Sequence, residues 1–452
     1  MLRPDIVFVQ TPEIGAGTLA QRFPKGSVIV RSNGAATKAE PIRLTDGFFA
    51  AADPEINFDA TKILFSAQKN QGEHWQIWEM DLDGGSKRQI TQCKGDCLRG
   101  AYLPADEIAF TVEEAREGRR ESYLAVVKAD GSQMRRITFG PAEFQLETVL
   151  RDGRIVATAP WPLIGGKEAS NSRLLYTLRP DGTALESFRC EHGRSGMVAD
   201  ASELEDGSLV FVKKAGVEAA GGEIKQIRRG AASSTAFGAP QAVYETLRPL
   251  STDQLIVSKK SAASNGSAAK FDLYALSAKT GLTGEEIFAD GHISSIQAVP
   301  VAPHAVPKRY WSTLNPESLD GFFISLNSYL AADVAKGHIT TPIAQVRVLT
   351  ANSSDGTEHS LGVAPVESDG SFYVRVPANA PIRFVLLDAK GQTIREERGW
   401  MWTRPGEQRG CPGCHGDKAV APENHWPLTL KRFDTPTALG EKEHGSATSQ
   451  AK

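Results

Sequence analysis

The chain has 452 residues, of which 23% are charged and 40% are hydrophobic, and its formal net charge is -3. This length exceeds one ordinary domain unless the domain is built from repeats. The slightly acidic balance argues against nucleic acid as a partner, because nucleic-acid binding requires a basic face. No apolar run approaches the ~18 residues that span a bilayer, so we expect no transmembrane segment.

A repeated unit within residues 1–298 predicts an all-β propeller. In each copy a turn with Asp or Gly leads into an apolar strand, and the copies recur every 45 to 54 positions. The strands begin at Ile63, Ile108, Ile155, Leu209 and Leu255. Asp-Gly pairs between apolar runs indicate hairpins, giving about four strands per unit. Such a period favours a β-propeller of six blades, or of seven with a closing strand from 296–302.

Two cysteines in this region are predicted to form a local disulfide. Cys93 and Cys97 flank Lys94-Gly95-Asp96, which is a turn sequence. An oxidising compartment favours their pairing. Free thiols, or a metal site that includes Cys190, are the alternatives.

The rest of the chain divides by composition into four segments. Residues 299–339 are Pro-rich and predict an extended linker. Residues 340–400 contain strand-like runs separated by turns, which favour a small β-sandwich with immunoglobulin-like packing. Residues 401–434 carry a Cys/His motif, and we expect the polar tail 435–452 to be disordered.

The motif Cys411-Pro412-Gly413-Cys414-His415 has the C-x-x-C-H spacing of a haem c attachment site. Each of the two thiols can form a thioether with one vinyl group of the porphyrin, and His415 then supplies the proximal ligand to the iron. We therefore predict one covalent haem c. A disulfide, a redox dithiol and half of a zinc site are the alternatives, although zinc requires two more ligands and the sequence has no second C-x-x-C.

This cofactor predicts the compartment. Haem c is attached outside the bacterial cytoplasm, so we expect a periplasmic or extracellular protein. The chain opens on Met1-Leu2-Arg3-Pro4-Asp5 without the basic and apolar regions of a signal peptide. We expect that an export segment, and any membrane anchor with it, preceded this N-terminus.

The ligand opposite His415 would decide what the haem does. His425 lies ten residues beyond His415 in a Pro-bounded loop and is our tentative distal ligand to the iron. Met401 is the second candidate, and an open iron is the third. The structural alternatives are an exposed loop histidine and a methionine packed between its tryptophan neighbours.

Other side chains near the motif suit the edges of a porphyrin. Trp402, with Trp400 and Trp426, is expected to wall the haem and exclude water. Arg404 and Arg409 are expected to pair with the propionates, because guanidinium groups bind carboxylates bidentately. Ordinary core packing of the tryptophans and surface placement of the arginines are the alternatives.

Two family resemblances follow from these residues. The repeats resemble those of TolB-type, WD40-like propellers. The order of propeller, Pro-rich crossover, a β-rich domain with Asp369-Gly370-Ser371-Phe372, and Arg404-Pro405-Gly406-Glu407 before the C-x-x-C-H resembles the hydrazine synthase alpha-subunit family. This resemblance covers nearly the whole chain, most specifically residues 365–427. It implies the propeller, the haem and export.

The chain also departs from that family. The family's type member carries two haem c sites and a tyrosine ligand four residues after the C-x-x-C-H histidine. This chain has one such motif, and Ala419 occupies the tyrosine position. The resemblance therefore leaves the reaction open.

Three functions compete. The first is an exported monohaem c-type cytochrome that transfers electrons within a redox complex, with the propeller docking a redox partner such as another cytochrome. The second is a haem enzyme or enzyme subunit, hydrazine synthase-like or peroxidase-like, with an open iron. The third is a binding scaffold with a structural haem. The sequence indicates neither a catalytic residue nor an oligomeric state.

Overall fold

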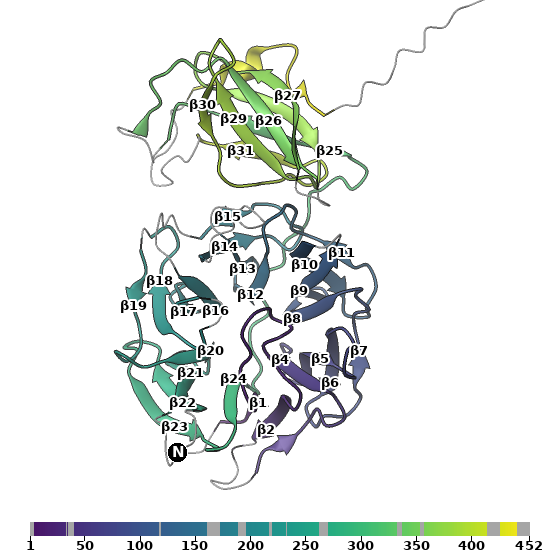
Figure 1. Cartoon of the computed structure of the whole chain (residues 1–452), viewed down its shortest axis with the longest axis vertical. Coiled ribbons are helices and arrows are strands. Elements are labelled where there is room, and N and C mark those ends of the chain that lie inside the picture. Colours follow the sequence, from purple (N-terminus) through teal and green to yellow (C-terminus); the bar gives the residue numbers. More distant parts are fainter. Residues whose placement is uncertain are drawn as a thin grey trace, which may run out of the picture. The chain divides into compact units, whose positions relative to one another are not determined.

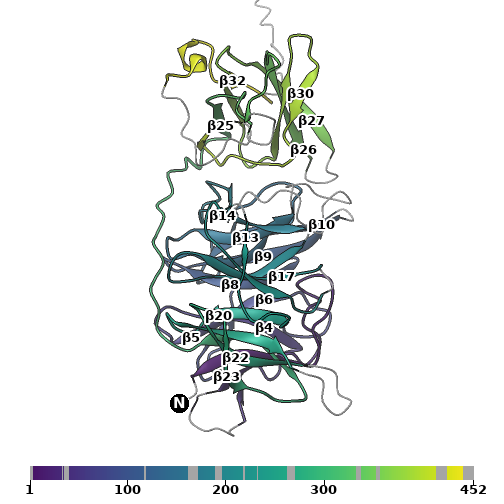
Figure 2. The ribbon, with the colours of Figure 1, turned by 90° about the vertical axis from the view of Figure 1, so that its left-hand side faces the viewer.

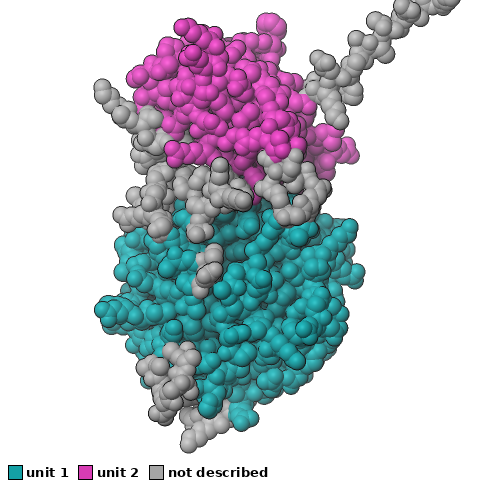
Figure 3. Space-filling model, in the orientation of Figure 1, with its two compact units in different colours: residues 1–138, 142–161, 169–311 teal, residues 139–141, 162–168, 312–452 magenta. Residues whose placement is uncertain are grey.

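The computed structural model describes residues 4–32, 34, 40–116, 119–160, 172–188, 196–216, 219–231, 233–261, 270–331, 337–352, 357–413 and 425–440. The described part of the chain is built of strands, with one short 3-10 helix, which confirms the all-β prediction. It forms two compact units (Figure 3). The first contains residues 1–138, 142–161 and 169–311, and the second contains 139–141, 162–168 and 312–452.

The first unit is a propeller whose described strands form six groups of four (Figure 1). One group joins both ends of the unit: β24 (Ser294–Pro300), β1 (Ile6–Thr11), β2 (Val28–Ser32) and β3 (Ile42–Arg43). Next come β4 (Ala50–Ile56), β5 (Lys62–Gln68), β6 (Gln76–Asp81) and β7 (Arg88–Gln89), then β8 (Asp96–Leu103), β9 (Glu107–Arg116), β10 (Arg119–Lys128) and β11 (Arg135–Arg136).

The remaining three groups repeat this plan. They are β12 (Gln145–Val149), β13 (Ile155–Pro160), β14 (Arg173–Leu178) and β15 (Glu186–Ser187); β16 (Met197–Glu203), β17 (Leu209–Lys214), β18 (Glu223–Ile227) and β19 (Thr235–Ala236); and β20 (Tyr244–Pro249), β21 (Gln254–Lys260), β22 (Phe271–Ser277) and β23 (Thr283–Phe288). A parallel contact between Arg173 and Met197 links β14 to β16. β24 pairs antiparallel with β1 and so closes the ring.

The repeated apolar positions of the sequence lie in the core of this unit. Ile63, Ile108, Ile155, Leu209 and Leu255 all lie near the start of the second strand of a group, and each is fully buried. The Asp-Gly pairs form the predicted turns: Gly84, after β6, has φ +83°, and Gly131, after β10, has φ +88°. Glycine adopts this left-handed conformation without steric cost. The repeat therefore fixes both the buried strand and the turn of a group.

A polar residue interrupts the innermost strand of each group at a shift in register. These residues are Asp53, Arg99, Glu147, Asp200, Glu245 and Gln297. A bulge leaves backbone groups unpaired with the neighbouring strand. We call this set the bulge ring.

Hydrogen bonds connect the bulge ring across neighbouring groups. The Asp53 carboxylate accepts the Arg99 N–H at 3.1 Å and the Gln297 side-chain amide at 2.7 Å. Arg99 donates to Glu147 at 2.8 Å, and Glu147 accepts the Ala201 N–H at 3.4 Å.

The second half of the circuit runs back to the closing strand. Asp200 accepts the Leu247 N–H and, at 2.9 Å, an Arg248 Nη1 donor. The Gln297 N–H donates to the Thr246 hydroxyl at 2.8 Å. Backbone groups freed by the bulges thus find acceptors on the adjacent group, and the circuit closes on itself.

The structure joins Cys93 to Cys97, which lies on β8, in a disulfide. This is the pairing favoured from the turn sequence between them. Cys190 lies outside the described residues.

The second unit is a sandwich of two four-stranded sheets (Figure 2). One sheet has the order β31 (Gln408–Cys411), β25 (Asp320–Ser325), β28 (Phe372–Pro377) and β32 (Thr437–Ala438). The other has the order β27 (Glu358–Pro365), β26 (Gln345–Ala351), β29 (Ile382–Leu387) and β30 (Thr393–Glu396). The 3-10 helix η3 (Leu428–Lys431) precedes β32. Phe323, Val346, Val374 and Phe384 belong to one buried cluster between the sheets.

The boundaries of this unit differ from those expected. β25 lies within 299–339, which was expected as linker, and β31 lies within the haem segment 401–434. These two strands pair in parallel, Phe322 opposite Gln408 and Ser325 opposite Cys411, although they are far apart in sequence. The tail 435–452 was expected to be disordered, but β32 lies in it and pairs with β28. Residues 441–452 lie outside the described part.

Across the described residues, the search for a helix long and apolar enough to cross a membrane finds none.

The bulge ring generates a prediction about stability. Glu147→Ala removes the carboxylate that neutralises the buried Arg99 guanidinium, while the side chain of Glu147 itself is 1% exposed. An uncompensated buried charge costs about 3–5 kcal/mol. We expect that loss in the free energy of unfolding, measured by urea denaturation. The control Glu205→Ala removes a pair between exposed groups, and we expect a change below about 0.5 kcal/mol. Equal effects of the two variants would contradict the role assigned to the ring.

Candidate functional site

The described part of the C-x-x-C-H motif begins at the end of a sheet strand. Cys411 is the last residue of β31, opposite Ser325 of β25. Beyond the strand, the Leu326 N–H donates to the Cys411 carbonyl at 2.9 Å. The backbone of Cys411 is therefore held by two neighbouring segments. Cys414, His415 and Ala419 lie outside the described residues.

Gly413 fits closely against the turn that follows β25. A Cβ atom at Gly413 would lie 2.7 Å from the Leu330 Cβ and 2.9 Å from the carbonyl oxygens of Asn327 and Leu330. Side-chain carbons do not tolerate contacts of this length with backbone atoms. The second intervening position of the motif therefore accepts only glycine in this packing.

A cavity of about 170 Å³ opens beside Cys411. Its described lining residues are Phe323, Ile324, Ser325, Phe372, Phe384, Glu397, Met401, Cys411 and Gly413. The Phe323 and Phe384 rings meet edge to face with centroids 5.1 Å apart, and Phe372 lies 5.4 Å from Phe384. The wall next to the thiol is therefore mainly aromatic, and Glu397 is the one carboxyl group among these lining residues.

The surroundings of Cys411 keep its sulfur protonated. Burial raises the pKa of the Cys411 thiol, and the nearby Glu397 acts in the same direction, while Arg409 opposes them. Desolvation disfavours the thiolate because that form carries the charge. At neutral pH this residue therefore presents an S–H group to the cavity.

Met401, one of the two candidate distal ligands, lies at the cavity. Its backbone forms a two-way bridge with Ile382: the Met401 N–H donates at 3.0 Å and its carbonyl accepts at 2.7 Å. This bridge holds Met401 beside β29 and brings its thioether to the wall that also contains Cys411. The proximity of Met401 to the motif is thus produced by the sandwich rather than by the local sequence.

His425, the other candidate, is held by an aspartate. Its Nε2 lies 3.3 Å from an oxygen of Asp369, which also accepts the Leu428 N–H at 2.8 Å. The other Asp369 oxygen accepts the Ser371 N–H and hydroxyl. Burial alone would raise the pKa of Asp369, but these hydrogen bonds and His425 together lower it.

One turn connects His425 with the motif. The segment Asn327–Leu330 contacts Gly413 on one side, and Gly370, the neighbour of Asp369, on the other: a Cβ at Gly370 would lie 2.8 Å from the Ser328 nitrogen. The two described residues that bracket 414–424, Gly413 and His425, are thus both anchored next to this turn. The structure brings His425 to the neighbourhood of the motif without placing it in the cavity.

The remaining predicted residues lie elsewhere. Trp402 is fully buried, and its carbonyl accepts an Arg409 donor at 3.1 Å, but it does not line the cavity. Arg404 donates to the Asn379 side chain at 2.5 Å, and its N–H donates to Glu407. Trp426 is 67% exposed, so burial gives no support to its expected place in a haem wall.

Sequence reasoning missed the aromatic wall and one histidine. Phe323 comes from the region expected to be linker, so nothing local linked it to the motif. His338 pairs with Leu330, whose side chain contacts Gly413, and its ring stacks on Tyr329 at 5.5 Å. Phe372 had a signal, because it ends the Asp-Gly-Ser-Phe run that had been singled out.

A family model and a curated relative both show similarity to the hydrazine synthase alpha subunit. Residues 328–416 match the family model of the hydrazine synthase alpha subunit middle domain. Hydrazine synthase subunit alpha of Kuenenia stuttgartiensis is 22% identical over an alignment 579 positions long, which covers 96% of this chain and 70% of that protein.

Solved structures extend the comparison to the fold. Kuenenia stuttgartiensis hydrazine synthase matches with a TM-score of 0.79 and 19% identity over 95% of this chain and 71% of that chain. TolB from Acinetobacter baumannii matches with a TM-score of 0.41 and 16% identity over 64% of this chain and 65% of that chain.

The packing of Gly413 generates a prediction. Gly413→Ala places a methyl group against Leu330 and Asn327, and we expect this clash to displace the motif and to lower haem incorporation. The control Pro412→Ala changes the exposed intervening residue, and we expect it to keep normal incorporation. The measurement is Soret absorbance per mole of purified protein. Equal haem content in the two variants would show that the turn does not position the motif.

The Asp369 network predicts a pH dependence. A lowered native pKa means that ionised Asp369 stabilises the fold above the ordinary Asp pKa of about 3.9, and that this stability is lost as the pH falls through the native pKa. We expect Asp369→Asn to be about 1–3 kcal/mol less stable at pH 7. The gap between variant and parent should shrink under acid conditions, as followed by urea unfolding across pH. A gap that does not change with pH would refute this account.

Proposed function

Because the chain belongs to a hydrazine synthase alpha-like family, we propose that it is a haem c-containing enzyme subunit of an exported redox complex. The match to the middle domain, 328–416, covers most of the residues that line the cavity and the whole C-x-x-C-H motif. The comparisons thus favour the enzyme-subunit hypothesis over the electron-transfer cytochrome that led the sequence analysis.

One observation carries the proposal: the Cys411 thiol opens on an aromatic cavity at the rigid end of a sheet strand. A porphyrin needs an apolar wall on which to rest and a protonated thiol at its edge. Phe323, Phe372 and Phe384 supply the first, and the raised pKa of Cys411 supplies the second. The residues present therefore fit a haem.

Attachment would use the two cysteines in the same way. The sulfur of Cys411 would add to one carbon of a vinyl group and its hydrogen to the other carbon, so the addition would consume no oxidant. Cys414 would do the same at the second vinyl group, and His415 would hold the iron. When bound, haem c supplies an iron centre whose potential depends on its axial ligands, its hydrogen bonds and its burial.

The described residues around the cavity have two roles in this proposal. The aromatic wall excludes water from the reacting side of the ring, which strengthens electrostatic interactions there. Glu397 places a carboxylate at the same cavity, where its oxygens can accept a proton from a bound substrate and return it. A carrier of electrons needs no such group, and this contrast supports the enzyme-subunit hypothesis.

We expect the residues that hold the iron to differ from those of the family's type member. Ala419 has no donor atom where the type member has a tyrosine, and the sequence contains a single C-x-x-C-H. We therefore propose hydrazine synthase-like haem chemistry as a class, with an iron whose sixth position is open or weakly bound. Partner proteins, including another redox protein, would dock on the propeller to supply electrons.

Electron transfer is the second candidate, and Met401 favours it. Its thioether lies at the cavity wall beside Cys411. A methionine opposite His415 would saturate the iron and raise its potential, as in cytochromes c. His425 would saturate it as well, after release from Asp369.

An optical spectrum tests the proposal. We expect the exported protein to carry one covalent haem that survives denaturation, and its reduced spectrum to change on addition of carbon monoxide. The double variant Cys411→Ala with Cys414→Ala should lose the covalent haem.

Ligand variants separate the two candidates. If the iron is open, Met401→Leu and His425→Ala should keep the parent spectrum and its response to carbon monoxide. A parent spectrum indifferent to carbon monoxide, which becomes responsive in one of these variants, would replace the enzyme by the electron carrier. A protein without a Soret band would refute both.

A further inference from the structure

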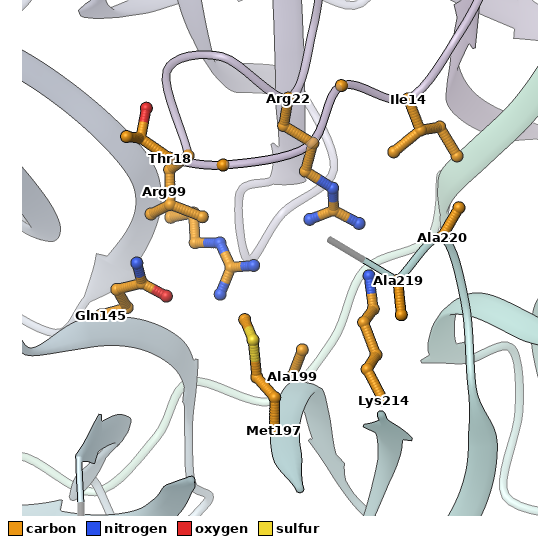
Figure 4. A pocket seen from close by; sticks show the side chains of 13 residues that line it. Ile14, Thr18, Arg22, Arg99, Gln145, Met197, Ala199, Lys214, Ala219 and Ala220 are labelled. Carbon is orange, nitrogen blue, oxygen red and sulfur yellow. The ribbon is translucent and has the colours of Figure 1, made fainter. Parts of the chain in front are cut away.

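A second cavity lies within the propeller unit, and its wall carries positive charge. Its described lining residues are Ile14, Gly15, Gly17, Thr18, Leu19, Arg22, Arg99, Gln145, Met197, Ala199, Lys214, Ala219 and Ala220. Three of these are cationic, and none of them is acidic. Figure 4 shows the nitrogens of Arg22, Arg99 and Lys214 directed from different sides toward one open space.

The three cations come from separate parts of the ring. Arg22 lies in the segment between β1 and β2, Arg99 is the bulge-ring residue of β8, and Lys214 ends β17. Their side chains are 9%, 12% and 8% exposed, in that order. Long cationic side chains are almost never buried to this extent unless they are paired. Their partners therefore decide what the cavity can bind.

Counted over the direct ion pairs of these three cations, one positive charge is in excess. Arg22 and Lys214 both bind the same oxygen of Glu245, at 2.6 and 2.7 Å. Arg99 has its own carboxylate, Glu147, at 2.8 Å. Arg22 and Lys214 thus share one carboxylate, whereas Arg99 and Glu147 form a pair of their own. Burial lowers the pKa of Lys214, and the neighbouring Arg22 lowers it further.

Arg22 also has a nitrogen donor that forms no hydrogen bond among the described residues. It gives its Nη2 to Glu245, but among the described residues its buried Nε meets no acceptor. A buried donor without a partner costs about 1–3 kcal/mol. An anion in the cavity would satisfy this demand for acceptors and would also neutralise the excess charge.

The volume of the cavity and its uncharged lining residues favour a small anion with an apolar end. The cavity volume is about 50 Å³, and on the same measure one water needs about 10–15 Å³. It therefore has room for a few heavy atoms. Ile14, Leu19, Met197 and Ala199 provide apolar surface, while Gln145 and Thr18 add polar groups.

We propose that this cavity is a binding site for a small monocarboxylate. The carboxylate lies between Arg22, Lys214 and Arg99, and the short apolar tail lies against Met197 and Ala199. One negative charge matches the single excess cation. Because Arg99 and Glu245 belong to the bulge ring, an occupied site also links neighbouring groups of the propeller.

Titration calorimetry on the full chain, as purified from a host that attaches haem c, tests the proposal with acetate as the probe. We expect one acetate per chain at constant ionic strength, with no change in the Soret band. Acetamide, which has the same shape without the charge, and chloride should not compete. This comparison requires no variant. Absence of acetate binding, or equal binding of acetamide, would overturn the proposal.

Lys214→Met is the variant of choice, because it removes the excess cation and leaves Arg22 paired with Glu245. We expect acetate affinity to fall at least about tenfold, since a hydrogen bond to a charged group is worth about 1.5–3 kcal/mol. The matched control is Lys213→Met, one position earlier on the same strand, where side chains alternate between faces. Lys213 does not line the cavity. Its variant should bind acetate as the parent does, and equal affinity of all three proteins would refute the site.

Discussion

The propeller depends on the bulge ring, where buried polar groups meet at the innermost strands. A carboxylate removed from water needs donors, and a bulge frees backbone N–H groups that need acceptors. In this protein the two demands satisfy each other across neighbouring groups: Asp53 accepts the Arg99 N–H, and Asp200 accepts the Leu247 N–H. Asp53, Arg99 and Asp200 adopt positive φ values near +53°, which cost energy for residues with a side chain. The hydrogen bonds offset that cost only when neighbours on both sides are in place, so the circuit favours the closed ring as a unit.

The same ring explains why charge collects in the propeller cavity. Each bulge places a polar side chain toward the centre, where no water-exposed surface is available to neutralise it. Glu147 and Arg99 cancel each other, but Glu245 attracts two cations, one from a loop and one from a strand end. The positive cavity is thus a consequence of how the ring is balanced. The haem segment depends on a different constraint, the parallel pairing of β25 with β31, which fixes Cys411 against an apolar core.

Sequence reasoning recovered what is periodic or local and missed what is not. The propeller followed from the recurrence of apolar strands and Asp-Gly turns, and the disulfide followed from four positions of sequence. The bulge ring was not predicted, although Glu147 and Glu245 lie buried within strands. Their spacing matches the repeat, which was the available signal. β25 was not predicted because its parallel partner β31 follows only after five other strands of the chain, so no local pattern linked the two.

The candidate site also combines a feature that the local sequence predicts with features that only the fold shows. C-x-x-C-H is a local signal, so the sequence alone predicts a role for Cys411, whereas the aromatic wall arises from strands on both sheets and could be seen only in the fold. Trp426, adjacent in sequence, is exposed, and Met401 reaches the cavity through its bridge to Ile382. Proximity in the sequence is therefore a poor guide to which residues line the cavity beside Cys411. Under the proposed function, the carboxyl group of Glu397 among the lining residues suits proton transfer with a small substrate, which electron transfer alone does not require.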